Sequence, residues 1–100
     1  MKRLTLDPYV VDTLLRDLVG HDRRPSAFIV YVYLWGATEG RRGAMAEFAL
    51  ARLAEETGLS KRAVQHALAH LERRRLLRVS RPLATAVATF ELLRPWRRGR

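Results

Sequence analysis

Residues 57–79 read "TGLSKRAVQHALAHLERRRLLRV" and contain the strongest structural signal in the chain. Ser60 is a favoured residue for beginning a helix, and the pattern that follows repeats at helical spacing. At about 100° per residue, one apolar stripe is formed by Val64, Ala67, Leu68 and Leu71. Arg75 would fall inside that stripe, so we expect the helix to end just before it. The stretch therefore predicts a helix over 61–73 with one buried face and an arginine run at its terminus.

The face opposite the stripe carries hydrogen-bond donors and no acidic residue. Arg62, His66, Ala69 and Arg73 lie on it, with Gln65 at its flank. Arginine and amide side chains match the acceptors and donors of base edges in the major groove, and a small alanine allows close approach. A charged face opposite an apolar stripe is also typical of an ordinary solvated helix. The face alone leaves both interpretations open.

The preceding residues favour a specific two-helix arrangement. "LARLAEETG", residues 50–58, is typical of a short helix with Leu50, Leu53 and Ala54 on one side. Ala54 permits close helix packing, and Gly58 suits a left-handed turn. Leu59 and Val64 are spaced to fill the corner between the two helices. This spacing predicts two helices joined by a tight turn over about 50–74.

Two earlier segments have helical features. In residues 6–20, Asp7 is expected to cap, Pro8 fits a first turn and Gly20 is suited to end the helix. The expected apolar stripe of this helix comprises Val11, Leu14, Leu15 and Leu18. Residues 26–40, "SAFIVYVYLWGATEG", have the β-branched and aromatic content of a buried strand. Their length, with Ser26 as a cap and Gly36 and Gly40 near the end, favours a buried helix.

Shorter segments alternate with these helices. "MAEFA", residues 45–49, "LLRVS", residues 76–80, and "ATAVATFELL", residues 84–93, are expected to be strands. The aromatic residues at helical spacing are expected in the core: Phe28, Tyr31 and Trp35. The tail "RPWRRGR" fits either a phosphate-binding arm or a solvated tail, and Trp96 favours one anchored on the domain. We expect one domain over 1–94 and a basic tail over 95–100.

Composition limits the classes of protein to which the chain can belong. It has 100 residues, 48% of them hydrophobic and 29% charged, which is typical of one small folded domain. It has no cysteine, so disulfides and thiolate sites are excluded. The N-terminus shows no signal-peptide pattern, and the longest apolar run, "AFIVYVYLW", is about half of a membrane span. We therefore expect a cytoplasmic protein with no membrane partner.

The positive charge is concentrated in the last part of the chain. The formal net charge is +9. Residues 61–100 contain eleven Lys or Arg and two Glu, so they account for the whole excess. A field of this kind attracts polyanions such as nucleic acids.

Residues 50–79, "LARLAEETGLSKRAVQHALAHLERRRLLRV", resemble the helix-turn-helix core of winged helix-turn-helix DNA-binding proteins. They are similar to that core in MarR-like and GntR-like transcription regulators and in some replication-initiation proteins. The resemblance implies a mostly α fold with a small β-hairpin wing over about 77–93, in the order α-α-β-α-α-β-β. The family usually has glycine where Arg75 stands, and the wing loop "SRPLAT" contains one cation, Arg81. The GntR-like signature is absent, and we expect a stand-alone binder or one module of a larger machine.

The resemblance implies sequence-specific binding of double-stranded DNA by a nucleoid-associated transcription regulator, with residues 61–73 in the major groove. Ser60 and Lys61 are expected on phosphates. The full predicted set of DNA-binding residues is Ser60, Lys61, Arg62, Gln65, His66, Ala69, Arg73 and Arg81. A homodimer would suit paired half-sites; the N-terminal helix is its candidate interface, although that apolar stripe fits a core equally well.

The alternative function is a protein-interaction module that binds an acidic partner, which the apolar wing tip "PLA" favours. His66 and His70 are four residues apart, as zinc ligands can be, but no third ligand accompanies them. A pair that faces the groove or the solvent is the other interpretation. No pattern indicates an enzyme, a cofactor, a metal or a small-molecule site.

Overall fold

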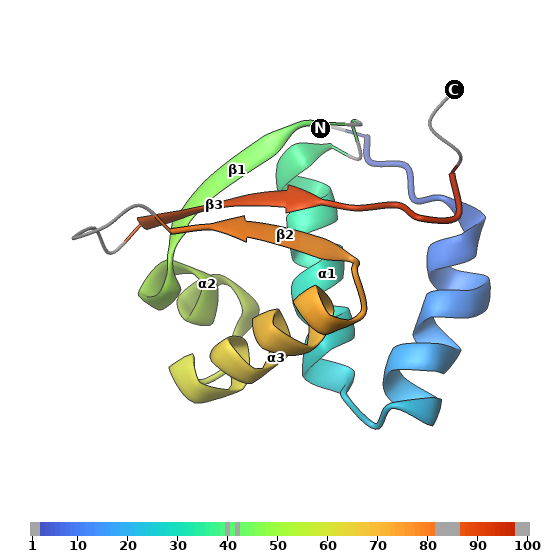
Figure 1. Ribbon diagram of the computed structural model, residues 1–100, viewed down its shortest axis with the longest axis horizontal. Helices are drawn as coiled ribbons and strands as arrows, with labels where there is room; N and C mark the ends of the chain where they lie inside the picture. Colours follow the sequence, from blue (N-terminus) through green and yellow to red (C-terminus); the bar gives the residue numbers. More distant parts are fainter. Residues whose placement is uncertain (1–2, 40, 42, 82–86, 98–100) are drawn as a thin grey trace.

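The computed structural model describes residues 3–39, 41, 43–81 and 87–97. Within this part of the chain, helices pack against a small three-stranded antiparallel sheet, which makes a compact mixed α/β fold (Figure 1). Helix α1, Pro25–Thr38, runs through the middle of the molecule, with α3, Lys61–Arg73, crossing on one side. The N-terminal helix lies on the other side (Figure 1).

The N-terminal helix forms, but with wider turns than predicted. Most of it consists of two π-helical segments, η1 over Val10–Leu14 and η2 over Arg16–His21. Its N–H groups bond to carbonyls five residues back, as in Asp22 N to Asp17 O at 2.7 Å. Wider turns keep residues four apart on one line. The buried residues are consequently Val10, Leu14 and Leu18.

Three predictions for this helix are wrong. Val11 and Leu15 are 51% and 38% exposed because the larger number of residues per turn rotates them out of the core. Gly20 lies inside η2, and the chain turns left-handed only at Arg23, with φ 57°. The Asp7 carboxylate provides no cap; it accepts a hydrogen bond from the Trp96 indole at 3.1 Å. The homodimer stays a prediction. Val11 and Leu15 are exposed apolar side chains of this helix, so they are available for such an interface.

Residues 25–38 form the buried helix favoured by their length, and Tyr31 and Trp35 are 0% and 1% exposed in the core. Phe28 is half-buried against that core. The predicted start of this helix is wrong. Pro25 occupies the first helical position and Arg24 the cap position, so Ser26 lies inside the helix. The helix ends near Gly36, as predicted: Thr38 is its last residue, and Glu39 follows with φ 56°. Gly40 lies outside the described residues.

The two-helix arrangement forms as predicted. Helix α2, Leu50–Thr57, ends at Gly58, whose φ of 77° is the left-handed conformation that glycine adopts without strain. Leu53 is fully buried in α2. The predicted stripe of α3 is buried as well, because its residues pack on α1 and α2.

The three predicted strands also form. They are β1 over Met45–Ala49, β2 over Leu77–Ser80 and β3 over Val87–Leu92. The central strand β3 pairs antiparallel with both neighbours, with Phe90 opposite Ala46 on one side and Val79 on the other. The predicted wing loop lies outside the described residues after Arg81.

Helix α3 ends in a Schellman motif centred on an arginine. The Leu76 N–H bonds to Leu71 O at 2.9 Å and the Arg75 N–H to Glu72 O at 3.0 Å. Arg75 takes the left-handed position with φ 58°, where a side chain crowds the backbone. The expected helix end before Arg75 is therefore confirmed.

The strain at Arg75 predicts the order of stability of two variants. Arg75→Gly should be more stable than Arg75→Ala by about 1 kcal/mol, because only glycine adopts this φ without steric cost. Urea denaturation of both proteins measures the difference. The matched pair Arg62→Gly and Arg62→Ala, in an ordinary helical position, should show the opposite order. Equal stability of the two Arg75 variants would contradict a strained left-handed residue.

Candidate nucleic-acid interface

The outer face of α3 begins at a capped helix start. Ser60 has extended backbone angles, and its hydroxyl oxygen accepts a hydrogen bond from the Ala63 N–H at 3.0 Å. The Ser60 hydroxyl proton is free of that bond and can donate outward. Lys61 and Arg62 follow in the first turn and are both exposed. Two cations and a hydroxyl donor therefore lie together at the N-terminal end of α3.

The predicted donor face is open to solvent. Val64 and Leu71 are fully buried, so the residues on the opposite side of the helix point outward. Gln65, His66 and Arg73 are exposed, and Ala69 between them is half-buried. Glu72 is the one acidic residue of α3, and it lies at the flank, 4.0 Å from the Arg81 guanidinium.

His70 does not form an outward-facing pair with His66, which corrects the sequence interpretation. Its side chain is only 13% exposed, and its Nε2 lies 2.7 Å from Oδ2 of Asp22. Asp22 follows η2, a segment far from α3 in the sequence. The helical spacing of the two histidines could not indicate this partner, because the aspartate comes from a loop of irregular structure.

Asp22 ties the end of α3 to the connector between η2 and α1. Oδ1 of Asp22 lies 2.8 Å from Nδ1 of His21, and Oδ2 of Asp22 lies 3.1 Å from Nε of Arg74. Burial acts to raise the pKa of Asp22, but the hydrogen bonds with His21 and His70 and the charge of Arg74 outweigh it, so the pKa lies below its usual value. A buried carboxylate surrounded by cationic and imidazole groups stays ionised and fixes the position of α3.

Arg24 is the residue of the candidate interface that the sequence did not indicate. It lies at the start of α1 and lines a pocket of about 180 Å³ together with His66, Ala69 and Arg73. The basic connector "HDRRP" was visible in the sequence. The position of this connector beside α3 was not visible there, because only the packing of α1 on α3 brings the connector and α3 together.

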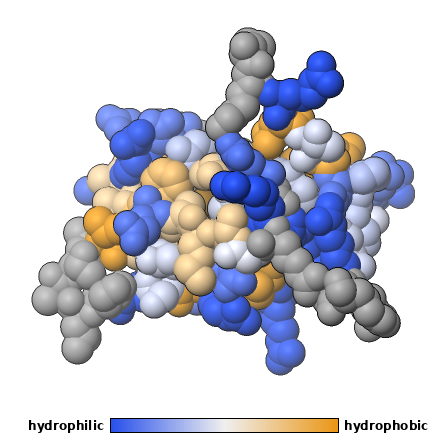
Figure 2. All heavy atoms as spheres, turned by 90° about the horizontal axis from the view of Figure 1, so that it is seen from above, coloured by the Kyte–Doolittle hydropathy of each residue, from blue (hydrophilic) through white to orange (hydrophobic). Residues whose placement is uncertain are grey.

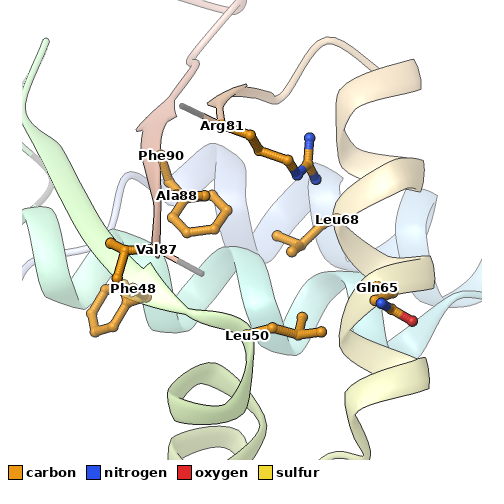
Figure 3. Close-up of a pocket in the computed structure, with 8 residues that line it drawn as sticks. All are labelled: Phe48, Leu50, Gln65, Leu68, Arg81, Val87, Ala88 and Phe90. Atoms are coloured by element: carbon orange, nitrogen blue, oxygen red, sulfur yellow. The ribbon is translucent and has the colours of Figure 1, made fainter. Parts of the chain in front are cut away.

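A second cleft, on the sheet side of α3, brings Gln65 and Arg81 together. It has a volume of about 160 Å³, and Arg81 extends from the end of β2 toward α3 (Figure 3). Its remaining lining residues are apolar: Phe48, Leu50, Leu68, Val87, Ala88 and Phe90. Gln65 and Arg81, two of the predicted site residues, therefore border one cleft.

The basic tail is anchored on the domain through Trp96. The Trp96 ring stacks on Tyr9 with ring centroids 4.5 Å apart, and its indole N–H donates to Asp7. The Arg97 guanidinium also bonds to Asp7. The anchored tail favoured by Trp96 is thus confirmed for residues 95–97, whereas 98–100 lie outside the described residues.

The face on the sheet side differs from the α3 face. Viewed from above, apolar and weakly polar side chains gather to the left of the middle of this face, with hydrophilic ones around and among them (Figure 2). Met45 on β1 and Val87 on β3 are 63% and 41% exposed. No helix in the described residues is long and apolar enough to span a bilayer.

No protein-family model matches the chain, and neither does any curated protein or solved structure. The candidate interface is therefore defined by the positions of the described side chains. Arg24 shares a pocket with α3 donors on one flank of the helix, and Arg81 shares a cleft with Gln65 on the other.

Removing the Asp22 carboxylate should weaken the fold in a pH-dependent way. The folded-state pKa of Asp22 is lowered, so its stabilisation is complete above the unfolded value of about 4 and is lost as pH falls through the folded value. Asp22→Asn should lower the unfolding free energy at pH 7 by about 1–3 kcal/mol. Below pH ~4 the variant should lose less further stability than the parent protein, because it has no Asp22 carboxylate to protonate. Urea denaturation between pH 2 and 7 measures both effects.

The matched control is Asp12→Asn, because Asp12 is exposed in η1. That variant should follow the parent protein at every pH. If the two variants have the same stability curve, Asp22 does not fix the end of α3.

Proposed function

We propose that this protein is a winged helix-turn-helix protein that binds double-stranded DNA sequence-specifically and regulates transcription, with α3 in the major groove. The observation that carries this proposal is the exposed face of α3, which has donors along its length and no acidic side chain among them. The major groove admits an α-helix and presents base acceptors to such donors. On this proposal the protein is a binding protein of the cytoplasm and nucleoid, not an enzyme.

Helix placement supports a division of roles along α3. Arg62 and Gln65 are exposed on its N-terminal half, the part of a recognition helix that meets base edges. Ser60 and Lys61 lie at the helix start, where a hydroxyl and an ammonium suit phosphate oxygens. Arg81 extends over the cleft beside Gln65, so it is suited to a contact on the adjacent part of the duplex.

The arrangement of elements also supports a winged fold. Helices α2 and α3 are joined by the left-handed Gly58, and α3 is followed directly by the antiparallel pair β2 and β3. Strand β1 adds to β3 and completes the sheet. A short helix pair followed by an antiparallel pair of strands is the arrangement that the sequence resemblance implies.

A second candidate function is a protein-interaction module. Met45 and Val87 expose apolar surface on strands β1 and β3, and the arginines elsewhere would suit an acidic partner. The predicted apolar wing tip lies outside the described residues. This alternative predicts no base preference when bound sequences are selected from random duplex DNA, whereas the DNA-binding proposal predicts one. Such a selection therefore separates the two functions.

Non-specific binding to duplex DNA should depend steeply on salt. With about five phosphates neutralised, log K should fall against log salt concentration with a slope of about −4 to −5. Fluorescence anisotropy with a labelled random duplex at several salt concentrations measures the slope. A slope near zero would contradict the DNA-binding proposal.

Arg62→Ala should reduce specificity more than general affinity. An arginine that bonds both acceptors of a guanine edge contributes about 1–3 kcal/mol on the preferred sequence and much less on others. Lys61→Ala should weaken binding to all sequences alike, because a phosphate contact carries no base information.

The measurement is a pair of titrations for each variant, one on a duplex selected from a random pool and one on its scrambled version. Lys61→Ala is the matched control, since both variants remove one exposed cation from the first turn of α3. Equal losses on both duplexes for Arg62→Ala would show that Arg62 does not contact base edges.

A further inference from the structure

The pocket formed by Arg24, His66, Ala69 and Arg73 has the chemistry of an anion site. Two arginines and a histidine line it, and none of the described acidic residues does. Its volume of about 180 Å³ is several times the ~10–15 Å³ that one water molecule needs, so a phosphate group fits. Ala69 has no side-chain atoms beyond Cβ, which leaves the middle of the pocket open.

The start of α1 adds to the positive field beside this pocket. Arg24 is the cap residue of that 14-residue helix, and no side chain caps its first N–H groups. The positive end of the helix dipole therefore lies next to the Arg24 backbone, where it favours negative charge. The helix end and the three basic side chains favour the same type of ligand.

The acidic residue two positions before Arg24 is already engaged by other side chains. Asp22 bonds to His70, His21 and Arg74, and its side chain is 8% exposed. His70 in turn presents Nδ1 toward Arg73 Nη2 at 3.5 Å. This contact positions the Arg73 guanidinium at the pocket, while Asp22 is left little capacity to compete for it.

We propose that the pocket of Arg24, His66, Ala69 and Arg73 binds a backbone phosphate of duplex DNA. This inference rests on the proposed function and adds Arg24 to the interface. It assigns His66 and Arg73 to the phosphate, whereas Arg62 and Gln65 remain available for base edges. A phosphate at this end of α3 fixes the register in which the first half of the helix meets the bases.

The first test compares Arg24→Gln with Arg23→Gln. Both remove one charge from neighbouring exposed residues, but only Arg24 lines the pocket. On a random duplex at ~0.1 M salt, Arg24→Gln and Arg73→Gln should each bind about fivefold more weakly than Arg23→Gln. Their salt slopes should be less steep than that of Arg23→Gln by about 0.9. Thermal melts confirm that each variant is folded.

The second test uses inorganic phosphate without DNA. The chain has three histidines, so His66→Gln identifies the ring proton signal of His66 by NMR. At constant pH and ionic strength, replacing chloride by phosphate should shift that signal saturably in the parent protein and in Arg23→Gln. The saturable shift should be lost in Arg24→Gln.

The outcomes separate this inference from the proposed function. Equal DNA affinities and slopes for Arg23→Gln and Arg24→Gln overturn the phosphate contact even if the parent protein binds DNA well. An unchanged His66 response in Arg24→Gln overturns the pocket itself. If the parent protein fails to bind DNA, the proposed function is contradicted, and so is DNA as the source of the bound phosphate. A saturable shift that depends on Arg24 would then assign the pocket to free phosphate.

Discussion

The burial of one face of α3 against α1 is the constraint on which the rest of the structure depends. Val64 and Leu71 are fully buried on that face, and Tyr31 is fully buried in α1. At about 2 kcal/mol for a buried aliphatic side chain, this stripe is a large part of the stability of so small a domain. Because a helix is a rigid cylinder, burying one face determines which side chains face solvent. The donor face of α3 is a consequence of its core face.

The three consecutive arginines after α3 show how packing gives identical residues different roles. Arg73 lies at the pocket beside His66, whereas Arg74 forms ion pairs with Asp22 and Asp17. Arg75 occupies the left-handed position that ends the helix. Only the first of the three belongs to the candidate interface. A count of positive charges in this segment would overstate its capacity to bind a polyanion.

The cluster of Asp22 with His21, His70 and Arg74 links the core to the candidate interface. It joins α3 to the connector that precedes α1, and the same connector supplies Arg24 to the pocket. Ionic contacts among partly buried groups are sensitive to the loss of any one partner, because the remaining charge is left uncompensated. The position of Arg24 relative to His66 therefore depends on Asp22 as well as on the apolar core. This dependence connects the acid stability of the fold with the geometry of the proposed phosphate site.

Local sequence determined the helices, the turn between α2 and α3, and the face of α3 that meets solvent. Ser60, Gly58 and the stripe from Val64 to Leu71 act through neighbours a few residues away, so periodicity and capping rules are sufficient. The same rules did not predict the π-helical pitch of η1 and η2, since a window of apolar spacing assumes ordinary helical turns.

Tertiary structure alone decided which distant residues meet. Asp22 contacts His70 across 48 positions, and Arg24 reaches the pocket of Arg73 because α1 packs on α3. Trp96 likewise meets Asp7 from the other end of the chain. Such contacts depend on the directions in which whole helices cross, which a local pattern does not contain. The sequence by itself therefore determined the donor face of α3, and only the packing of α1 on α3 decided that Arg24 would join it.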